Sequence, residues 1–167
     1  MRTLIAFLGC ITIMSGCSSQ NTTIHPDRSG YLQDQQVVAL KTHDGYYLRA
    51  INGGGDDVVS DSKDFTPFAK FTLELIDKEA SKVRLKTSNG HYVHPILGGG
   101  TNVDAKIKIP LTSEVFTLDW VGKDKRTISL ITREGYYLHT VDGVTRNIDA
   151  TAKTRTRSEV YTLVFLD

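Results

Sequence analysis

The chain has 167 residues, of which 40% are hydrophobic, and a formal net charge of +1. This size suits one folded domain behind a short leader, and the near-zero charge provides no global field for nucleic acid or an acidic membrane surface. Both cysteines, Cys10 and Cys17, lie near the start of the chain, so the rest has no thiol for a disulfide. The folded part must therefore be stabilised by packing.

The start of the chain has the pattern of an export signal. Arg2 provides a positive charge, residues 4–14 form an apolar run, and small residues precede Cys17. The run is too short for a membrane span, which needs about 20 apolar residues. The ending Met-Ser-Gly-Cys at residues 14–17 resembles a bacterial lipobox, which implies cleavage before Cys17 and a lipid on its thiol. The alternative is an ordinary secretory signal with a chance cysteine.

This interpretation divides the chain into three parts. Residues 1–16 are expected to be a signal peptide, residues 17–32 the lipidated cysteine and a polar tether, and residues 33–167 a single folded domain. The lipobox resemblance implies a bacterial cell-envelope location, anchored by lipid to the outer membrane on its periplasmic or surface face.

The folded part is an internal repeat. Gly45, Gly90 and Gly135 recur every 45 residues, and the surrounding sequence matches in all three copies. The copies fill residues 33–77, 78–122 and 123–167, and such a period marks stacked or symmetric units that share a core.

Each copy carries four short strand signals and no sustained helical stripe. In the first copy they fall at residues 38–42, 46–50, 58–59 and 71–76. Asp44-Gly45 and Asn89-Gly90 are typical of tight hairpin turns, because both residue types tolerate positive φ. Three four-stranded units are too few for a propeller, so the pattern predicts an all-β fold, the β-trefoil, with a pseudo-threefold barrel capped by hairpins.

Six apolar positions recur in every copy and form the predicted core. They are Val38, Val83 and Ile128; Leu40, Leu85 and Leu130; Leu48, Val93 and Leu138; Val58, Val103 and Ile148; Phe71, Phe116 and Tyr161; and Leu73, Leu118 and Leu163.

Residues 36–167 resemble the fascin-like trefoil family. The resemblance rests on a Leu-Lys-Thr strand at residues 40–42 and 85–87, a Gly-x-Tyr-Leu strand at residues 45–48, Gly-Gly-Gly loops and a Phe-x-Leu strand. It implies a binding or scaffolding module and not an enzyme. The third copy departs from it, with Val144 and Thr145 in place of two glycines, and the Gln-x-Trp strands of ricin-type trefoils are missing.

The sequence shows no pattern for catalysis or for a cofactor. The glycine loops lack the lysine and the following helix of a phosphate loop. His91 and His94 are three residues apart, which places them on opposite faces of a strand, where they cannot share one metal. The aspartates around the first loop lack the spacing of a calcium loop.

Eight residues at variable, outward positions are the candidate ligand-binding set. An aromatic face beside amide or carboxylate groups suits a sugar, whose C–H face stacks while its hydroxyls form hydrogen bonds. The alternative is that tyrosine is simply common in strands. The set comprises Tyr46, His91 and Tyr136 at one repeat position, Arg49, His94 and His139 at a second, and Asn52 and Asp142 at a third.

A second candidate surface is cationic. Lys153, Arg155 and Arg157 alternate with threonines, and Arg146 lies nearby. They indicate either a solvated loop or a patch for an acidic glycan, a lipid head group or a protein.

Two functional hypotheses follow. The first is a lipid-anchored, non-catalytic module that binds carbohydrate. The second is a protein–protein module, such as an inhibitor or immunity lipoprotein directed at a secreted protein. Under both hypotheses we expect a monomer that contacts the membrane through its lipid. Its expected partner is a glycan, or an envelope or secreted protein, and it is not expected to bind nucleic acid.

Overall fold

The computed structural model describes residues 32–124, 126–142 and 146–166. The predicted signal peptide, Cys17 and residues 18–31 of the predicted tether lie outside this part. The described part contains four strands per repeat, and its helical elements are three single 3-10 turns, η2 (Ile51–Gly53), η3 (Pro67–Ala69) and η4 (Ile96–Gly98). The strands are β1 (Gln36–Thr42), β2 (Tyr47–Ala50), β3 (Val58–Ser62), β4 (Phe71–Asp77), β5 (Lys82–Thr87), β6 (Tyr92–Pro95), β7 (Val103–Ile107), β8 (Phe116–Trp120), β9 (Thr127–Ile131), β10 (Tyr137–Thr140), β11 (Ile148–Ala152) and β12 (Tyr161–Phe165).

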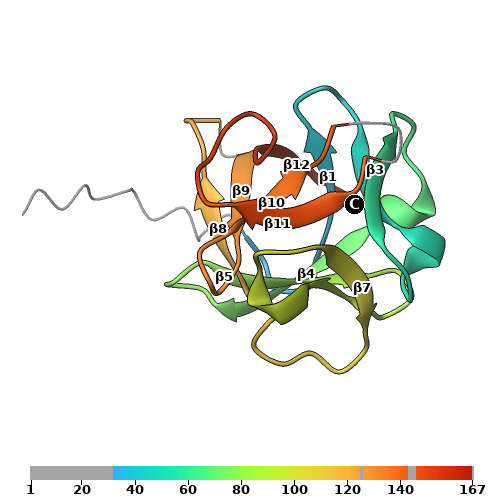
Figure 1. Ribbon diagram of the computed structural model, residues 1–167, viewed down its shortest axis with the longest axis horizontal. Helices are drawn as coiled ribbons and strands as arrows, with labels where there is room; N and C mark the ends of the chain where they lie inside the picture. Colours follow the sequence, from blue (N-terminus) through green and yellow to red (C-terminus); the bar gives the residue numbers. More distant parts are fainter. Residues whose placement is uncertain (1–31, 125, 143–145, 167) are drawn as a thin grey trace, which may run out of the picture.

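Six strands close into an antiparallel barrel (Figure 1). The order around it is β1, β4, β5, β8, β9 and β12, and β12 pairs back with β1. The hairpins β2–β3, β6–β7 and β10–β11 cap it, and isolated bridges such as Asp57 with Asp104 join one hairpin to the next. This is the predicted β-trefoil.

The predicted core is confirmed at every position. All eighteen recurring side chains are at most 2% exposed and belong to one hydrophobic cluster. A closed barrel places equivalent residues of the three copies around one axis, so the same side-chain type recurs at each level. Leu32 also lies in this cluster, with 2% exposure. The folded part therefore begins at least one residue before the predicted boundary.

The hairpin turns differ in one detail from the sequence expectation. Gly45, Gly90 and Gly135 have φ of 92°, 78° and 79°, whereas the preceding Asp44 and Asn89 are not in the left-handed region. Each turn is closed by a bond from the glycine N–H to a threonine carbonyl three residues earlier, 3.0 Å long in all three copies. Because only the glycine needs positive φ, glutamate can precede it in the third copy.

The third copy carries a tyrosine, Tyr161, where the others have phenylalanine. Its hydroxyl lies 3.3 Å from Thr140 Oγ1, and both side chains are buried. Burial raises the pKa of the Tyr161 hydroxyl well above its ordinary value, so the group stays neutral. The pair thus supplies a polar contact inside an otherwise apolar core.

We expect Tyr161→Phe to lower the free energy of unfolding by about 1–3 kcal/mol, because it leaves the Thr140 hydroxyl buried without a partner. The double variant Tyr161→Phe/Thr140→Ala restores the Phe71 and Ala50 pairing of the first copy. It should recover at least half of that loss in urea unfolding. A double variant less stable than the single one would contradict this account.

Candidate functional site

The predicted aromatic positions lie at the junctions between repeats. At two of these junctions, the half-buried ring of His91 or Tyr136 contacts the glycine loop of the repeat before it. A Cβ built on Gly54 would lie 2.7 Å from His91 Nδ1, and one on Gly99 would lie 2.7 Å from Tyr136 Cδ2. The loop backbone therefore covers part of each ring, and these loops need glycine because a side chain would collide with the ring.

The third junction joins the last repeat to the first and contains Tyr46. The Arg146 guanidinium lies 3.9 Å from the centre of the Tyr46 ring, and Lys63 Nζ lies 4.9 Å from it. Arg146 also donates a 2.6 Å hydrogen bond to Asp44. Val144 and Thr145, which replace two glycines in this copy, lie outside the described residues.

The second predicted position lies beside carboxylates in all three repeats. In the first, Arg49 donates two hydrogen bonds to Asp61, 2.7 and 2.6 Å long. These bonds hold the pKa of the Asp61 carboxyl below its ordinary value of 3.8, although partial burial opposes them. Arg49 is thus oriented by its own hairpin.

The histidines of the second position each lie between two carboxylates. His94 Nδ1 is 3.0 Å from Asp104 and its Nε2 is 3.7 Å from Glu114. His139 has the same arrangement, at 2.9 Å from Asp149 and 3.6 Å from Glu159.

Sequence reasoning missed the four acids around these histidines. The signal was available: in both repeats an aspartate follows the histidine by 10 residues and a glutamate follows it by 20. The two glutamates, Glu114 and Glu159, are only 2% exposed.

In the first copy, the third predicted position contacts the repeat that follows. Asn52 has φ 56°, and its carbonyl accepts a 2.6 Å hydrogen bond from the side chain of Asn89 in the next repeat. Tyr46 contacts the preceding repeat instead. The first-repeat residues are therefore divided, because Asn52 lies beside the second repeat and Tyr46 lies beside Arg146 of the third. Asp142, the third-repeat member of this position, is exposed.

The predicted cationic surface is largely paired. Lys153 Nζ donates to the Glu134 carbonyl and lies 3.5 Å from the centre of the Tyr136 ring. Arg155 pairs with Asp119. With Arg146 held by Asp44, three of the four predicted members have partners within the fold, which reduces their capacity to hold an anionic ligand.

No group of three or more His, Cys, Asp or Glu side chains in residues 32–124, 126–142 and 146–166 is arranged to hold a metal ion. Over the same residues, no helix has the length and apolar character to cross a bilayer.

Sequence comparison with protein-family models and with curated proteins gives no match. Solved structures do match, and those below have the β-trefoil fold. A designed threefold-symmetric protein, ThreeFoil, superposes with a TM-score of 0.68 and 16% identity over 78% of this chain and 99% of that one.

Two lectin structures match about as well. A Polyporus squamosus lectin bound to the human-type influenza-binding epitope Neu5Acα2-6Galβ1-4GlcNAc gives a TM-score of 0.66 and 13% identity over 79% of this chain and 49% of that one. SeviL bound to asialo-GM1 saccharide gives 0.64 and 14% over 79% and 98%. At these identities the likeness establishes the fold.

Proposed function

We propose that this protein is a non-catalytic carbohydrate-binding module that uses the junctions between its repeats. The observation that carries the proposal is the close contact at the first two junctions, where the ring of His91 or Tyr136 lies against the glycine loop of the repeat before it. At the first of these junctions, the exposed Asn52 lies at the entrance of that loop. Two lectins of the same fold that are bound to saccharides support a glycan as the ligand.

The contacts at the junctions leave less of each ring face open for stacking on a sugar than the sequence analysis assumed. Because loop backbone and cations lie against the rings, the free ring edges, the exposed Asn52 amide and the Asp142 carboxylate provide the hydrogen bonds to sugar hydroxyls. Such sites are shallow and bury little ligand surface, so each binds weakly. The junctions differ in side chains, and we expect the one with Asn52 and His91 to prefer neutral glycans.

A glycan array probed with residues 18–167 tests the proposal. For any neutral glycan that binds, Asn52→Gly should weaken affinity roughly 2- to 10-fold, the effect of losing one hydrogen bond. Glycine preserves the positive φ at this position. The matched control is Leu97→Gly, at the equivalent position of the second repeat, where φ is 57°. An array without any bound glycan would refute carbohydrate binding.

We further propose that the trefoil is of the fascin-like type and is held in a bacterial cell envelope by lipid on Cys17. The repeated Leu-Lys-Thr strands and the Met-Ser-Gly-Cys sequence at residues 14–17 support these two assignments. With the lipid attached, the tether keeps the binding surface close to the membrane.

Cys17→Ala should abolish incorporation of labelled palmitate and leave the protein unprocessed or soluble. The control is Cys10→Ala, which lies within the apolar run and should be labelled normally. Continued labelling of the Cys17 variant would exclude this anchor.

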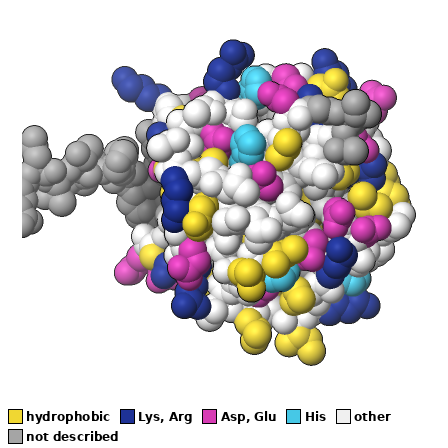
Figure 2. Space-filling view, viewed as in Figure 1, with side chains coloured by type: hydrophobic (Ala, Val, Ile, Leu, Met, Phe, Trp, Pro, Cys, Tyr) yellow, Lys and Arg dark blue, Asp and Glu magenta, His cyan; other side chains and the backbone are white. Residues whose placement is uncertain are grey.

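A second candidate function, protein binding, is favoured by exposed apolar side chains in the second repeat. Leu97, Ile109 and Leu111 are 86%, 81% and 70% exposed. Hydrophobic side chains gather at the lower edge of the face in Figure 2, over the β7 hairpin and the loop that follows it. A silent glycan array together with a co-purifying protein that is lost in Leu97→Ser would favour this function.

A further inference from the structure

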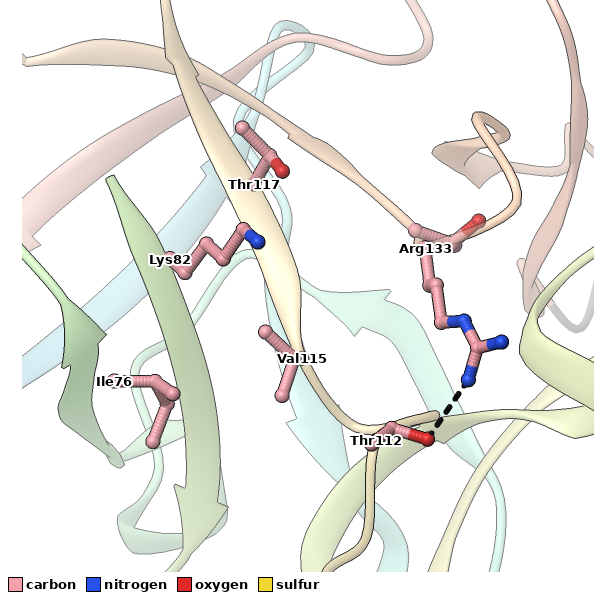
Figure 3. A pocket seen from close by; sticks show the side chains of 7 residues that line it. Ile76, Lys82, Thr112, Val115, Thr117 and Arg133 are labelled. Atoms are coloured by element: carbon pink, nitrogen blue, oxygen red, sulfur yellow. Dashed lines mark hydrogen bonds between the residues drawn. The ribbon is translucent and has the colours of Figure 1, made fainter. Parts of the chain in front are cut away.

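A cavity of about 450 Å³ opens on the outer wall of the barrel, beside the second junction, because Thr132 both lines the cavity and lies next to Gly99. It lies where the segment that leads into β8 passes between β5 and the end of β9 (Figure 3). Its volume falls within the range of about 300–1,000 Å³ found for small-molecule sites. It is large enough for one sugar ring.

Two cations and a set of hydroxyls line this cavity. Figure 3 shows Lys82 and Thr117 on one side and Arg133 on the other, with Val115 between them. Arg133 Nη1 donates a 3.0 Å hydrogen bond to Thr112 Oγ1, which positions the guanidinium at the cavity. No carboxylate lines the cavity among the described residues. The adjacent acid is Glu134, 3.5 Å from Arg133 Nε, and both of these side chains are more than half exposed to solvent.

The two cations are departures from the repeat pattern. Lys82 aligns with Val37 and Thr127 of the other copies, and Arg133 aligns with His43 and Ser88. The position next to Arg133, by contrast, is threonine in all three copies: Thr42, Thr87 and Thr132. The fold itself does not require either cation, because the other copies form the same strands without one. This wall alone therefore combines a lysine and an arginine at these two positions.

We propose that this cavity binds an acidic sugar, a pyranose that carries a carboxylate or a sulfate. Arg133 and Lys82 hold the anionic group through charge-assisted hydrogen bonds, which are shorter and stronger than neutral ones. The threonine hydroxyls, Thr112 and Thr117 among them, bond to the sugar hydroxyls, while Ile76 and Val115 contact the apolar C–H face. The inference rests on the proposed carbohydrate-binding function and adds a ligand class and a second location.

Three probes that differ only at C6 test the inference: glucose, glucuronic acid and glucose 6-sulfate. They are titrated by calorimetry into the full-length protein in detergent. We expect at least one acidic sugar to bind roughly tenfold or more tightly than glucose, as one charge-assisted contact would provide. Comparing the carboxylate with the sulfate identifies which anion is preferred. Glucose binding as tightly as both acidic sugars would overturn the proposal.

Variants separate the cavity from the junctions. Lys82→Thr and Arg133→Ser introduce residues already present in the other copies, so the fold should tolerate them, and unfolding curves check this. Each should weaken binding of the acidic sugar roughly tenfold, whereas Lys70→Gln, an exposed lysine outside the cavity, should not. Unchanged binding in both cavity variants would refute the site.

Two further results distinguish this inference from the proposed function. Neutral glycans that bind in an Asn52-dependent way, with no acidic sugar bound, would refute the cavity and leave the junction sites standing. Inorganic sulfate that binds as tightly as glucose 6-sulfate would show a simple anion site and overturn the assignment to a sugar.

Discussion

Leu85→Ala is expected to lower the free energy of unfolding by about 2–5 kcal/mol. Leu85 is 1% exposed and lies in the central cluster, where removing three carbons leaves a cavity that the closed barrel cannot fully collapse. Leu40 and Leu130 occupy the equivalent positions and are equally buried, so their alanine variants should fall in the same range. Urea or guanidinium unfolding measures each loss.

The matched control for these variants is Leu111→Ala, which deletes the same atoms from a side chain that is 70% exposed. It should change the free energy of unfolding by no more than about 0.5 kcal/mol. Losses of similar size in Leu85→Ala and Leu111→Ala would mean that burial in the barrel does not determine stability at these sites. A large loss at only one of the three core leucines would contradict their equivalence.

Gly99→Ala is expected to cost at least about 2 kcal/mol, for two reasons that add. Its backbone, at φ 129° and ψ 176°, lies in a region that is populated almost only by glycine. Its new methyl group would also lie 2.7 Å from the Tyr136 ring and 2.8 Å from the Thr132 hydroxyl. The ring must move, so the variant should also disturb the junction between the second and third repeats.

Gly90→Ala is the control because Gly90 also has positive φ, at 78°, but a Cβ there would meet nothing within 4 Å. It should lose only the backbone preference, about 1–2 kcal/mol. The difference between the two variants contains the collision at the junction and the stricter backbone requirement of Gly99. If thermal or denaturant unfolding gives equal losses, the glycine loop does not depend on close contact with the ring.

Together these variants connect stability with the candidate binding surface. Gly99 permits the close approach that positions Tyr136, and Gly54 does the same for His91 with an almost identical backbone. A substitution that disturbs a junction should therefore weaken glycan binding there as well as stability. Leu85→Ala, which acts in the core, should reduce stability while a folded sample keeps its affinity.

The fold follows directly from the sequence because its information is repeated. The 45-residue period, the alternating apolar residues and the turn glycines are local signals, and each occurs three times. Equivalent residues around one axis must meet the same packing demand, so the recurring positions identified the core without error.

The candidate site depended on contacts that no local pattern encodes. The sequence placed Tyr46 and Asn52 in one repeat, but the tertiary structure places them at different junctions, because each glycine loop crosses to the ring of the next repeat. The sequence analysis identified His94 and His139 but not their partners Glu114 and Glu159. The structure shows these partners, because the chain passes beside each histidine again 20 residues later.

The cavity at Lys82 and Arg133 depends on tertiary contacts more than any other candidate site. Its two cations are 51 positions apart, and only barrel closure through β5, β8 and β9 brings them to one wall. The sequence by itself thus determined which apolar side chains form the core, since their burial follows from periodicity, while the closure of the barrel decided which polar side chains meet.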